Sequence, residues 1–197
     1  MIHASESNSK APATVLVVMG SVRAARLCPR IASWVIDIAV AASTSKYELV
    51  DLADWPLPLD DEPEIPALGP YRQAHTQAWS RKILAADGFV FVTPQYNWGY
   101  PAVLKNAIDH LYAEWRGKPA VIVTYGGHGG VKCAAQLRQV AAAVHMRPTA
   151  TMPAITLTRE MMGGGPMVPE QDFMSEAQVI RQAIRELSEG IDSLVTY

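Results

Sequence analysis

Residues 88–111 read GFVFVTPQYNWGYPAVLKNAIDHL, and this stretch decides the fold. It begins with an apolar run of aromatic and β-branched side chains, which is typical of a strand buried on both faces of a parallel sheet. It ends with Leu104, Ile108 and Leu111 at helical spacing. The stretch therefore predicts one strand–loop–helix step of an α/β protein. The loop between them, at 94–101, is rich in aromatic rings that a plain connector does not need.

The same alternation of apolar runs and helical repeats extends along the rest of the chain. Further strands are expected at 14–19, 47–52 and 120–124, with a fifth at 147–151 or at 154–157. Apolar residues recur at helical spacing in 27–42, 104–111, 137–144 and 177–194. Parallel strands need crossover helices, and these crossovers are right-handed. We therefore predict an open, doubly wound, five-stranded parallel sheet with helices on both faces.

Composition excludes several classes of protein. The chain has 197 residues, of which 49% are hydrophobic and 18% charged, and its net charge is −2. This charge gives no long-range attraction to nucleic acid or to an anionic membrane. Two cysteines provide neither a disulfide framework nor a metal cluster. Residues 1–12 lack the apolar core of a signal peptide, and no stretch is long and apolar enough to span a bilayer. We expect a mobile tail at 1–12, a single domain at 13–197 and a cytoplasmic location.

Ligands bind such sheets at the carboxyl ends of the strands, so the loops after the expected strands are the places to search. Loop 1, GSVRAARL at 20–27, offers the hydroxyl of Ser21, the guanidinium groups of Arg23 and Arg26, and the start of a helix. These groups favour an anion. The loop matches neither a P-loop nor a dinucleotide fingerprint, so we expect one terminal phosphate. The alternative is a serine cap with surface arginines.

Loop 3, YGGHGG at 125–130, holds four glycines in six residues. Glycine is favoured where backbone approaches a flat ligand closely or where φ is positive. The alternative interpretation is a flexible turn. We expect His128, a lone histidine in this loop, to be exposed and not catalytic.

Loop 2, PQYNWGYP at 94–101, lies between these two. Pro94 ends the strand, and Pro101 suits the first turn of the next helix. Backbone N–H groups and ring faces then lie at the carboxyl edge of the sheet, which we call its mouth. A planar heterocycle with carbonyl edges would fit there. A phosphate at loop 1 and a planar ring at loops 2 and 3 describe a mononucleotide. Flavin mononucleotide (FMN) fits better than an adenosine phosphate, because both rims of the ring site are rich in backbone groups and glycine.

Three blocks of sequence, at 20–35, 94–111 and 125–138, resemble the NADPH-dependent FMN reductase family. This family of flavodoxin-like proteins includes small quinone, azo-dye and chromate reductases. The segment DLADWPLPLDDE at 51–62 is also similar, and the likeness covers about 14–158. The resemblance implies a flavodoxin-like sheet with strand order 2-1-3-4-5.

The resemblance also implies a set of FMN-binding positions. Loop 1 would hold the phosphate and the ribityl chain, loop 2 would place its backbone against the ring edge, and loop 3 would flank the pyrimidine end. Position 95 is glutamine where glutamate is commoner in the family. The implied residues are Ser21, Arg23, Arg26, Leu27, Pro94, Gln95, Tyr96, Asn97, Tyr125, Gly126 and Gly127.

The implied activity is FMN-dependent NAD(P)H oxidoreduction, with NAD(P)H as co-substrate and a small acceptor such as a quinone, azo compound, flavin or metal oxyanion. Turnover would be ping-pong in one pocket, and no residue is assigned a catalytic role, because the cofactor carries the chemistry. The resemblance implies a homodimer or homotetramer, with no nucleic acid or membrane partner. Two alternatives remain, a flavodoxin-type electron carrier and a scaffold without flavin. The net charge and the arginines of loop 1 argue against the carrier.

Three features lie outside the implied FMN set. Trp98 and Tyr100 are candidates for substrate stacking or for a subunit interface. Cys28 is expected to be a small buried residue under loop 1, with a redox role as the alternative. The methionines of 158–171 would cover the flavin of a neighbouring subunit or line a substrate entry.

Overall fold

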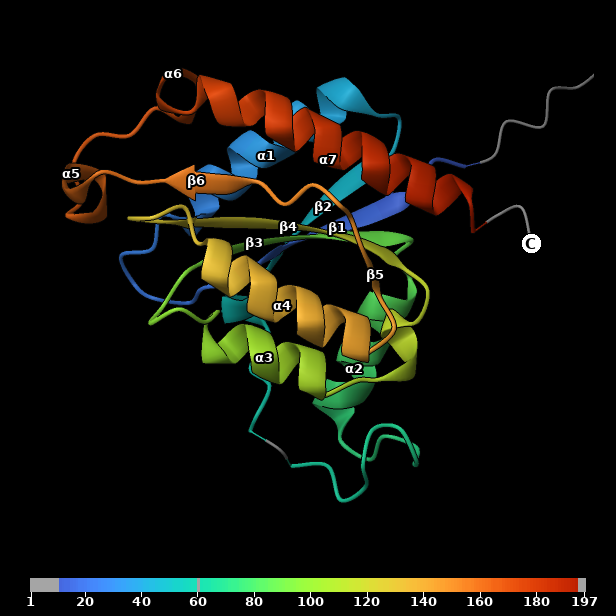
Figure 1. The fold of residues 1–197 in the computed structure, drawn as a ribbon. Coiled ribbons are helices and arrows are strands. Elements are labelled where there is room, and N and C mark those ends of the chain that lie inside the picture. The colour runs from blue at the N-terminus through green and yellow to red at the C-terminus, as the bar shows by residue number, and fades with distance from the viewer. Residues whose placement is uncertain (1–10, 60, 195–197) are drawn as a thin grey trace, which may run out of the picture.

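The centre of the sheet is formed by two strands that are buried along almost their whole length. The computed structural model describes residues 11–59 and 61–194 (Figure 1). Every residue of β3 (Gly88–Pro94) is buried, and so is every residue of β4 (Pro119–Gly126) except Gly126. All strand pairs are parallel, in the order β2-β1-β3-β4-β5, and β6 also pairs with β4. The predicted flavodoxin-like order is thus confirmed. The strands are β1 (Thr14–Met19), β2 (Lys46–Asp51), β3 (Gly88–Pro94), β4 (Pro119–Gly126), β5 (Arg147–Pro148) and β6 (Ala154–Thr156).

Helices cover both faces of the sheet (Figure 1). Helices α1, α6 and α7 lie on one face, whereas α2, α3 and α4 lie on the other, and α5 stands beyond one end of the sheet. The helices are α1 (Cys28–Ala42), α2 (Ala74–Leu84), α3 (Ala102–Asp109), α4 (Val131–Ala143), α5 (Arg159–Met162), α6 (Pro169–Asp172) and α7 (Met174–Asp192), with short 3-10 turns η1 (Leu52–Asp54) and η2 (Ala113–Trp115).

Two separate apolar cores result, because neighbouring residues of each strand point to opposite faces. Val90 and Val92 of β3 pack against α1 and α7. Phe89 and Phe91 pack on the other side with Trp115 of η2, and the Phe89 and Trp115 rings meet edge to face at a centroid distance of 5.0 Å. The continuous apolar run of β3 therefore reflects burial on both faces, as its composition predicted.

The fifth strand position is divided between two short segments. β5 pairs with the amino end of β4, and β6 pairs with its carboxyl end. Both stretches considered from sequence are therefore strands of one edge, and 149–153 runs between them without strand pairing. Thr149 fills part of this interval with hydrogen bonds, since its N–H donates to the Ala120 carbonyl at 2.9 Å and its hydroxyl donates to the Thr151 carbonyl at 2.9 Å.

Three local features differ from the sequence prediction or fall outside it. Helix α2 was not identified from spacing, because its buried face contains Thr76 and Ser80 beside Trp79 and Ile83. Pro101 occupies the N-cap of α3 and not its first turn. The expected N-terminal tail falls mostly on 1–10, outside the described residues.

No helix within the described ranges is long and apolar enough to cross a membrane.

The close crossing of loop 1 and β3 yields a first prediction. A Cβ atom at Gly20 would lie 2.8 Å from Thr93 Oγ1 and 3.0 Å from Leu104 Cδ2. We expect Gly20→Ala to lower the free energy of unfolding by about 1–3 kcal/mol, because the added methyl group overpacks this crossing. Chemical denaturation measures the change.

Gly163→Ala is the matched control, because a Cβ there would meet the carbonyl oxygens of Arg159 and Glu160 at the ordinary distance of 3.4 Å. Equal stability losses in the two variants would contradict a steric origin at Gly20.

Candidate functional site

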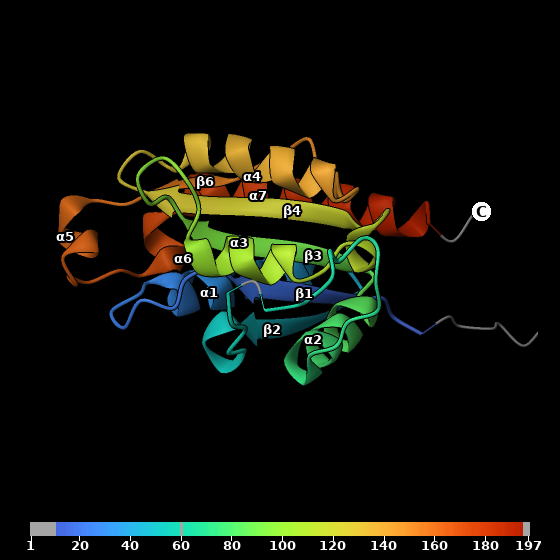
Figure 2. The same ribbon diagram turned by 90° about the horizontal axis from the view of Figure 1, so that it is seen from below.

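Loops 1, 2 and 3 meet at the carboxyl edge of the sheet. In two perpendicular views they lie at the same end of the strands, beside α5 (Figures 1 and 2). This placement follows from the parallel pairing of β1, β3 and β4, which brings their carboxyl ends together. The three loops predicted from sequence to form one site are therefore neighbours.

Tyr96 joins loop 2 to loop 1. Its hydroxyl lies 2.9 Å from the hydroxyl of Ser21, which is almost fully buried. The guanidinium carbon of Arg23 lies 4.2 Å from the centre of the Tyr96 ring, so the cation stacks on the aromatic face. One side chain therefore positions both the hydroxyl and a cation of loop 1.

Loop 1 presents hydrogen-bond donors without protein acceptors. Within the described part of the chain, the backbone N–H groups of Val22, Ala24 and Ala25 donate to no protein atom. Arg26 forms an ion pair with Asp51 at the end of β2. The Nε of Arg26 is buried, and it is the one such side-chain nitrogen or oxygen among the described residues that has no hydrogen-bond partner. Buried donors are nearly always paired in proteins, so this donor set is chemically suited to an anion.

The tip of loop 2 is a tight two-residue turn. The N–H and C=O groups of Tyr96 exchange hydrogen bonds with those of Gly99 at 2.8 and 2.9 Å. The intervening Asn97 and Trp98 have φ values of 47° and 72°. Positive φ is uncommon for residues other than glycine, and such strain gathers at functional sites. The turn leaves the Trp98 side chain 61% exposed at the mouth of the sheet.

Gln95 joins loop 2 to loop 3. Its backbone N–H donates to the Tyr125 carbonyl at 2.9 Å. Its side-chain Oε1 accepts a hydrogen bond from the N–H of Cys133 at 3.1 Å, in the first turn of α4. The side chain thus satisfies one of the unpaired donors at the start of that helix. A glutamate would offer the same acceptor oxygen, which explains how either residue suits this position.

Loop 3 lies close to neighbouring side chains at its glycines. Gly130 has φ 85°, and a Cβ there would lie 2.8 Å from the side chain of Thr124. Gly127 and His128 are exposed, and within the described ranges their N–H groups donate to no protein atom. Met162 of α5 lies over Gly127, because a Cβ on that glycine would meet Met162 Cε at 3.3 Å. The segment at 158–171 therefore borders this loop of its own chain.

Two further predicted positions, Leu27 and Tyr125, pack against the apolar core. The Tyr125 side chain is buried in the core beside Cys28, and Leu27 packs against the same core. Burial raises the pKa of the Cys28 thiol to about 11, although its hydrogen bond with Tyr125 acts in the opposite direction. The thiol therefore stays protonated near neutral pH, which supports the structural interpretation of Cys28 over a redox one.

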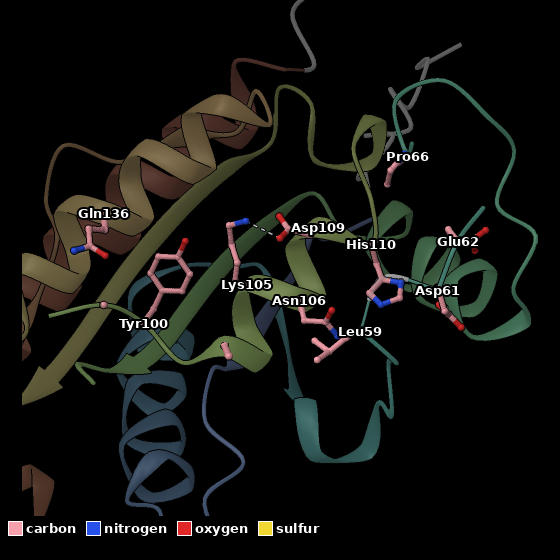
Figure 3. Close-up of a pocket in the computed structure, with 12 residues that line it drawn as sticks. Leu59, Asp61, Glu62, Pro66, Tyr100, Lys105, Asn106, Asp109, His110 and Gln136 are labelled. Atoms are coloured by element: carbon pink, nitrogen blue, oxygen red, sulfur yellow. Dashed lines mark hydrogen bonds and ion pairs between the residues drawn. The ribbon is translucent and has the colours of Figure 1, made fainter. Parts of the chain in front are cut away.

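A cavity of about 600 Å³ lies beside α3 and not over loops 1 and 3 (Figure 3). Tyr100 and Gln136 stand at one end of it, and the Lys105–Asp109 ion pair, at 2.6 Å, lies in the middle. Tyr100 thus belongs to the wall of this cavity, whereas Trp98 stands at the tip of loop 2.

The far end of the cavity holds a cluster of possible metal ligands. Single ligand atoms of Asp61, His75 and His110 lie within 4.8 Å of one another. However, His110 Nδ1 is 3.1 Å from the Thr76 hydroxyl, and its Nε2 is 2.7 Å from the Pro58 carbonyl. Both ring nitrogens are engaged in hydrogen bonds, so His110 has no lone pair available for a metal.

Comparison with known proteins agrees with the blocks identified in the sequence. A family model described as NADPH-dependent FMN reductase matches residues 13–157. The chain is 53% identical over 181 residues to an NAD(P)H-dependent FMN reductase of Schizosaccharomyces pombe, covering 91% of this chain and 90% of the relative. It is 36% identical over 135 residues to a quinone reductase of Escherichia coli, covering 64% of this chain and 68% of the relative.

Solved structures share the fold. The flavoenzyme NAD(P)H:(acceptor) oxidoreductase FerB of Paracoccus denitrificans has a TM-score of 0.64 at 24% identity, covering 88% of this chain and 98% of that one. An archaeal flavodoxin has a TM-score of 0.58 at 10% identity, covering 91% of this chain and 99% of that one. These likenesses support the fold alone, whereas the family match and the yeast relative settle the family. The chain therefore belongs to the NADPH-dependent FMN reductase family of oxidoreductases, with FMN as cofactor and NAD(P)H as electron donor.

Proposed function

We propose that loop 1 binds the phosphate of FMN. The observation that carries this proposal is a set of donors that have no acceptor among the described residues: the N–H groups of Val22, Ala24 and Ala25, and the buried Nε of Arg26. A phosphate accepts several hydrogen bonds at once, so it fits a cluster of donors better than a neutral ligand does. The hydroxyl of Ser21 and the guanidinium of Arg23, both held by Tyr96, complete the predicted phosphate site, with Leu27 beside the ribityl chain.

The planar ring of FMN would lie between loops 2 and 3. Pro94, Gln95, Tyr96 and Asn97 form one predicted rim, and Tyr125, Gly126 and Gly127 form the other. The hydrogen bonds of Gln95 keep the two rims together. The N–H groups of Gln95 and Tyr96 already donate to Tyr125 and Gly99. Within the described residues, the N–H groups of Asn97, Gly127 and His128 donate to no protein atom, so they are available to carbonyl edges of the ring.

When bound, FMN would accept a hydride from NAD(P)H and pass the electrons to a small acceptor in a ping-pong cycle. The chain supplies binding and orientation, and no side chain is assigned as a catalytic acid or base. Exposed apolar side chains stand on the segments that border the mouth, namely Trp98, Val131 and Met162. Such a surface suits flat acceptors, so quinones, azo compounds and flavins are the proposed classes. Metal oxyanions are a further proposed class that rests on the family resemblance alone.

We further propose a cytoplasmic homodimer or homotetramer. Leu59, Ile65 and Leu68, in the segment that borders the cavity beside α3, are 80%, 65% and 79% exposed. Exposed large apolar side chains close together are typical of a surface that another chain covers. This arrangement supports an oligomer, and the family resemblance further implies that a partner subunit would help to wall the active site.

The function predicts a spectroscopic result. The protein purified with FMN should absorb in the visible range, and anaerobic NADPH or NADH should bleach that absorbance. Adding a quinone should restore it, because the acceptor removes the electrons. If neither nucleotide bleaches the bound FMN, the electron-carrier alternative is favoured. If the protein stays colourless after soaking with FMN, the scaffold alternative is favoured.

The phosphate site predicts a selective loss of affinity in Ser21→Ala. A hydrogen bond to a charged group contributes about 1.5–3 kcal/mol, so the dissociation constant for FMN should rise by about tenfold or more. The affinity for riboflavin, which lacks the phosphate, should change much less. Fluorescence titration of the apoprotein with each flavin measures both constants.

Tyr96→Phe is the matched control, because it removes the same Ser21–Tyr96 hydrogen bond but keeps the serine hydroxyl. It should change the affinities for FMN and riboflavin by similar factors. A Ser21→Ala variant that weakens both flavins equally would contradict a phosphate contact.

A further inference from the structure

The mouth of the sheet is basic although the whole chain is slightly acidic. Residues 20–36, 94–108 and 115–159 contain no aspartate or glutamate, while the net charge of the chain is −2. Loops 1 and 3 and the first turn of α4 carry three cations, Arg23, Arg26 and Lys132. Arg26 is paired with Asp51, but neither Arg23 nor Lys132 forms an ion pair within the described residues. Of these three cations, Arg23 and Lys132 are therefore the two without an ion pair in the described part of the chain.

Lys132 is held in an unusual place. Its Nζ lies 3.5 Å from the centre of the Trp98 indole ring, which fixes the ammonium between loop 2 and α4. Lys132 lies in the first turn of α4, where the helix dipole disfavours a positive charge. Trp98 in turn occupies a strained turn position with φ 72°. The Trp98–Lys132 contact is therefore kept despite two unfavourable features, the cation at the start of α4 and the positive φ of Trp98. A surface pair without a function would not need either feature.

The contact combines an aromatic surface with a cation. The indole is 61% exposed and offers a face on which a planar base can stack. The ammonium beside it offers donors and charge to a phosphate. Arg23 stacks on Tyr96 beside the donors of loop 1, and we have assigned it to the phosphate of FMN. Of the three cations in loops 1 and 3 and the first turn of α4, Lys132 is therefore the one that remains for a second phosphorylated ligand.

An adenosine 2′-phosphate joins a planar base to a dianion, and its 2′-phosphate is the group by which NADPH differs from NADH. We propose that Trp98 and Lys132 form the subsite for this group, with Trp98 stacking on the adenine and Lys132 pairing with the 2′-phosphate. The protein then favours NADPH over NADH. This inference rests on the proposed function, because NAD(P)H must enter the mouth that loops 1, 2 and 3 surround.

The test compares the two nucleotides in Lys132→Gln, Lys132→Arg and Trp98→Ala. Stopped-flow bleaching of the FMN-loaded protein under anaerobic conditions gives the dissociation constant of each nucleotide. Lys132→Gln should weaken NADPH about tenfold and leave NADH within about twofold, because only NADPH loses a charge-assisted bond. Lys132→Arg should keep most of the NADPH preference. Trp98→Ala should weaken both nucleotides, because both carry adenine.

A binding measurement without turnover provides a second readout. Calorimetric titration of the same holoproteins with adenosine 2′,5′-bisphosphate and with adenosine 5′-monophosphate should show loss of the preference for the bisphosphate in Lys132→Gln. Lys46→Gln is the control, because Lys46 is exposed at the start of β2, at the opposite edge of the sheet. That variant should leave both nucleotide affinities unchanged.

Three results would overturn the proposal: no preference for NADPH in the unmodified protein, an equal effect of Lys132→Gln on both nucleotides, or no effect on either. The contact between Trp98 and Lys132 would then be a surface contact without a role in nucleotide binding. These results differ from failure of the proposed function, in which neither nucleotide bleaches the FMN of the unmodified protein at any concentration.

Discussion

The site depends on two neighbouring side chains of loop 2, which tie together three loops that are distant in sequence. Tyr96 holds Ser21 and stacks beneath Arg23, and Gln95 caps the first turn of α4 through the N–H of Cys133. A parallel sheet brings the carboxyl ends of its strands together but leaves the loops there without regular pairing. These side-chain contacts supply the missing order. They also explain why the loop carries polar and aromatic groups that a simple connector does not need.

The same contacts set the electrostatics of the mouth. Among the described residues, several N–H groups of loop 1 and the buried Nε of Arg26 have no protein acceptors. Arg23 and Lys132 stack on aromatic rings and form no ion pair with a carboxylate of that part of the chain. A cation on an aromatic face keeps its charge available to a ligand, whereas an ion pair with a carboxylate would neutralise it. A family of oxidoreductases that uses FMN and NAD(P)H handles several phosphate groups. A basic mouth on a slightly acidic chain suits that task.

Two aromatic residues of loop 2, Trp98 and Tyr100, lie in different surroundings. Trp98 stands at the tip of the strained turn near Lys132, while Tyr100, two residues later, lines the cavity beside α3. The turn at Asn97 and Trp98 separates them, because two successive residues with positive φ reverse the chain direction. Trp98 therefore belongs to the proposed nucleotide subsite, whereas Tyr100 lines the cavity next to the proposed subunit surface. Their composition alone does not distinguish these roles.

The sequence by itself determined the strands, their parallel order and the family. Long apolar runs such as that of β3 can only be buried on both faces, and the blocks at 20–35, 94–111 and 125–138 identify the family. It did not reveal α2, whose buried face includes polar residues that find partners only in the folded chain. Thr76 lies beside His110, and Ser80 donates to Glu114.

The tertiary structure alone decided where the site side chains point. It buried Tyr125 beside Cys28, paired Arg26 with Asp51 and placed Lys132 over Trp98. Periodicity reports which residues are buried in a regular element, because burial repeats with the geometry of the strand or helix. Contacts between loops have no such repeat. They depend on how distant segments meet in space, so only the folded chain can determine them.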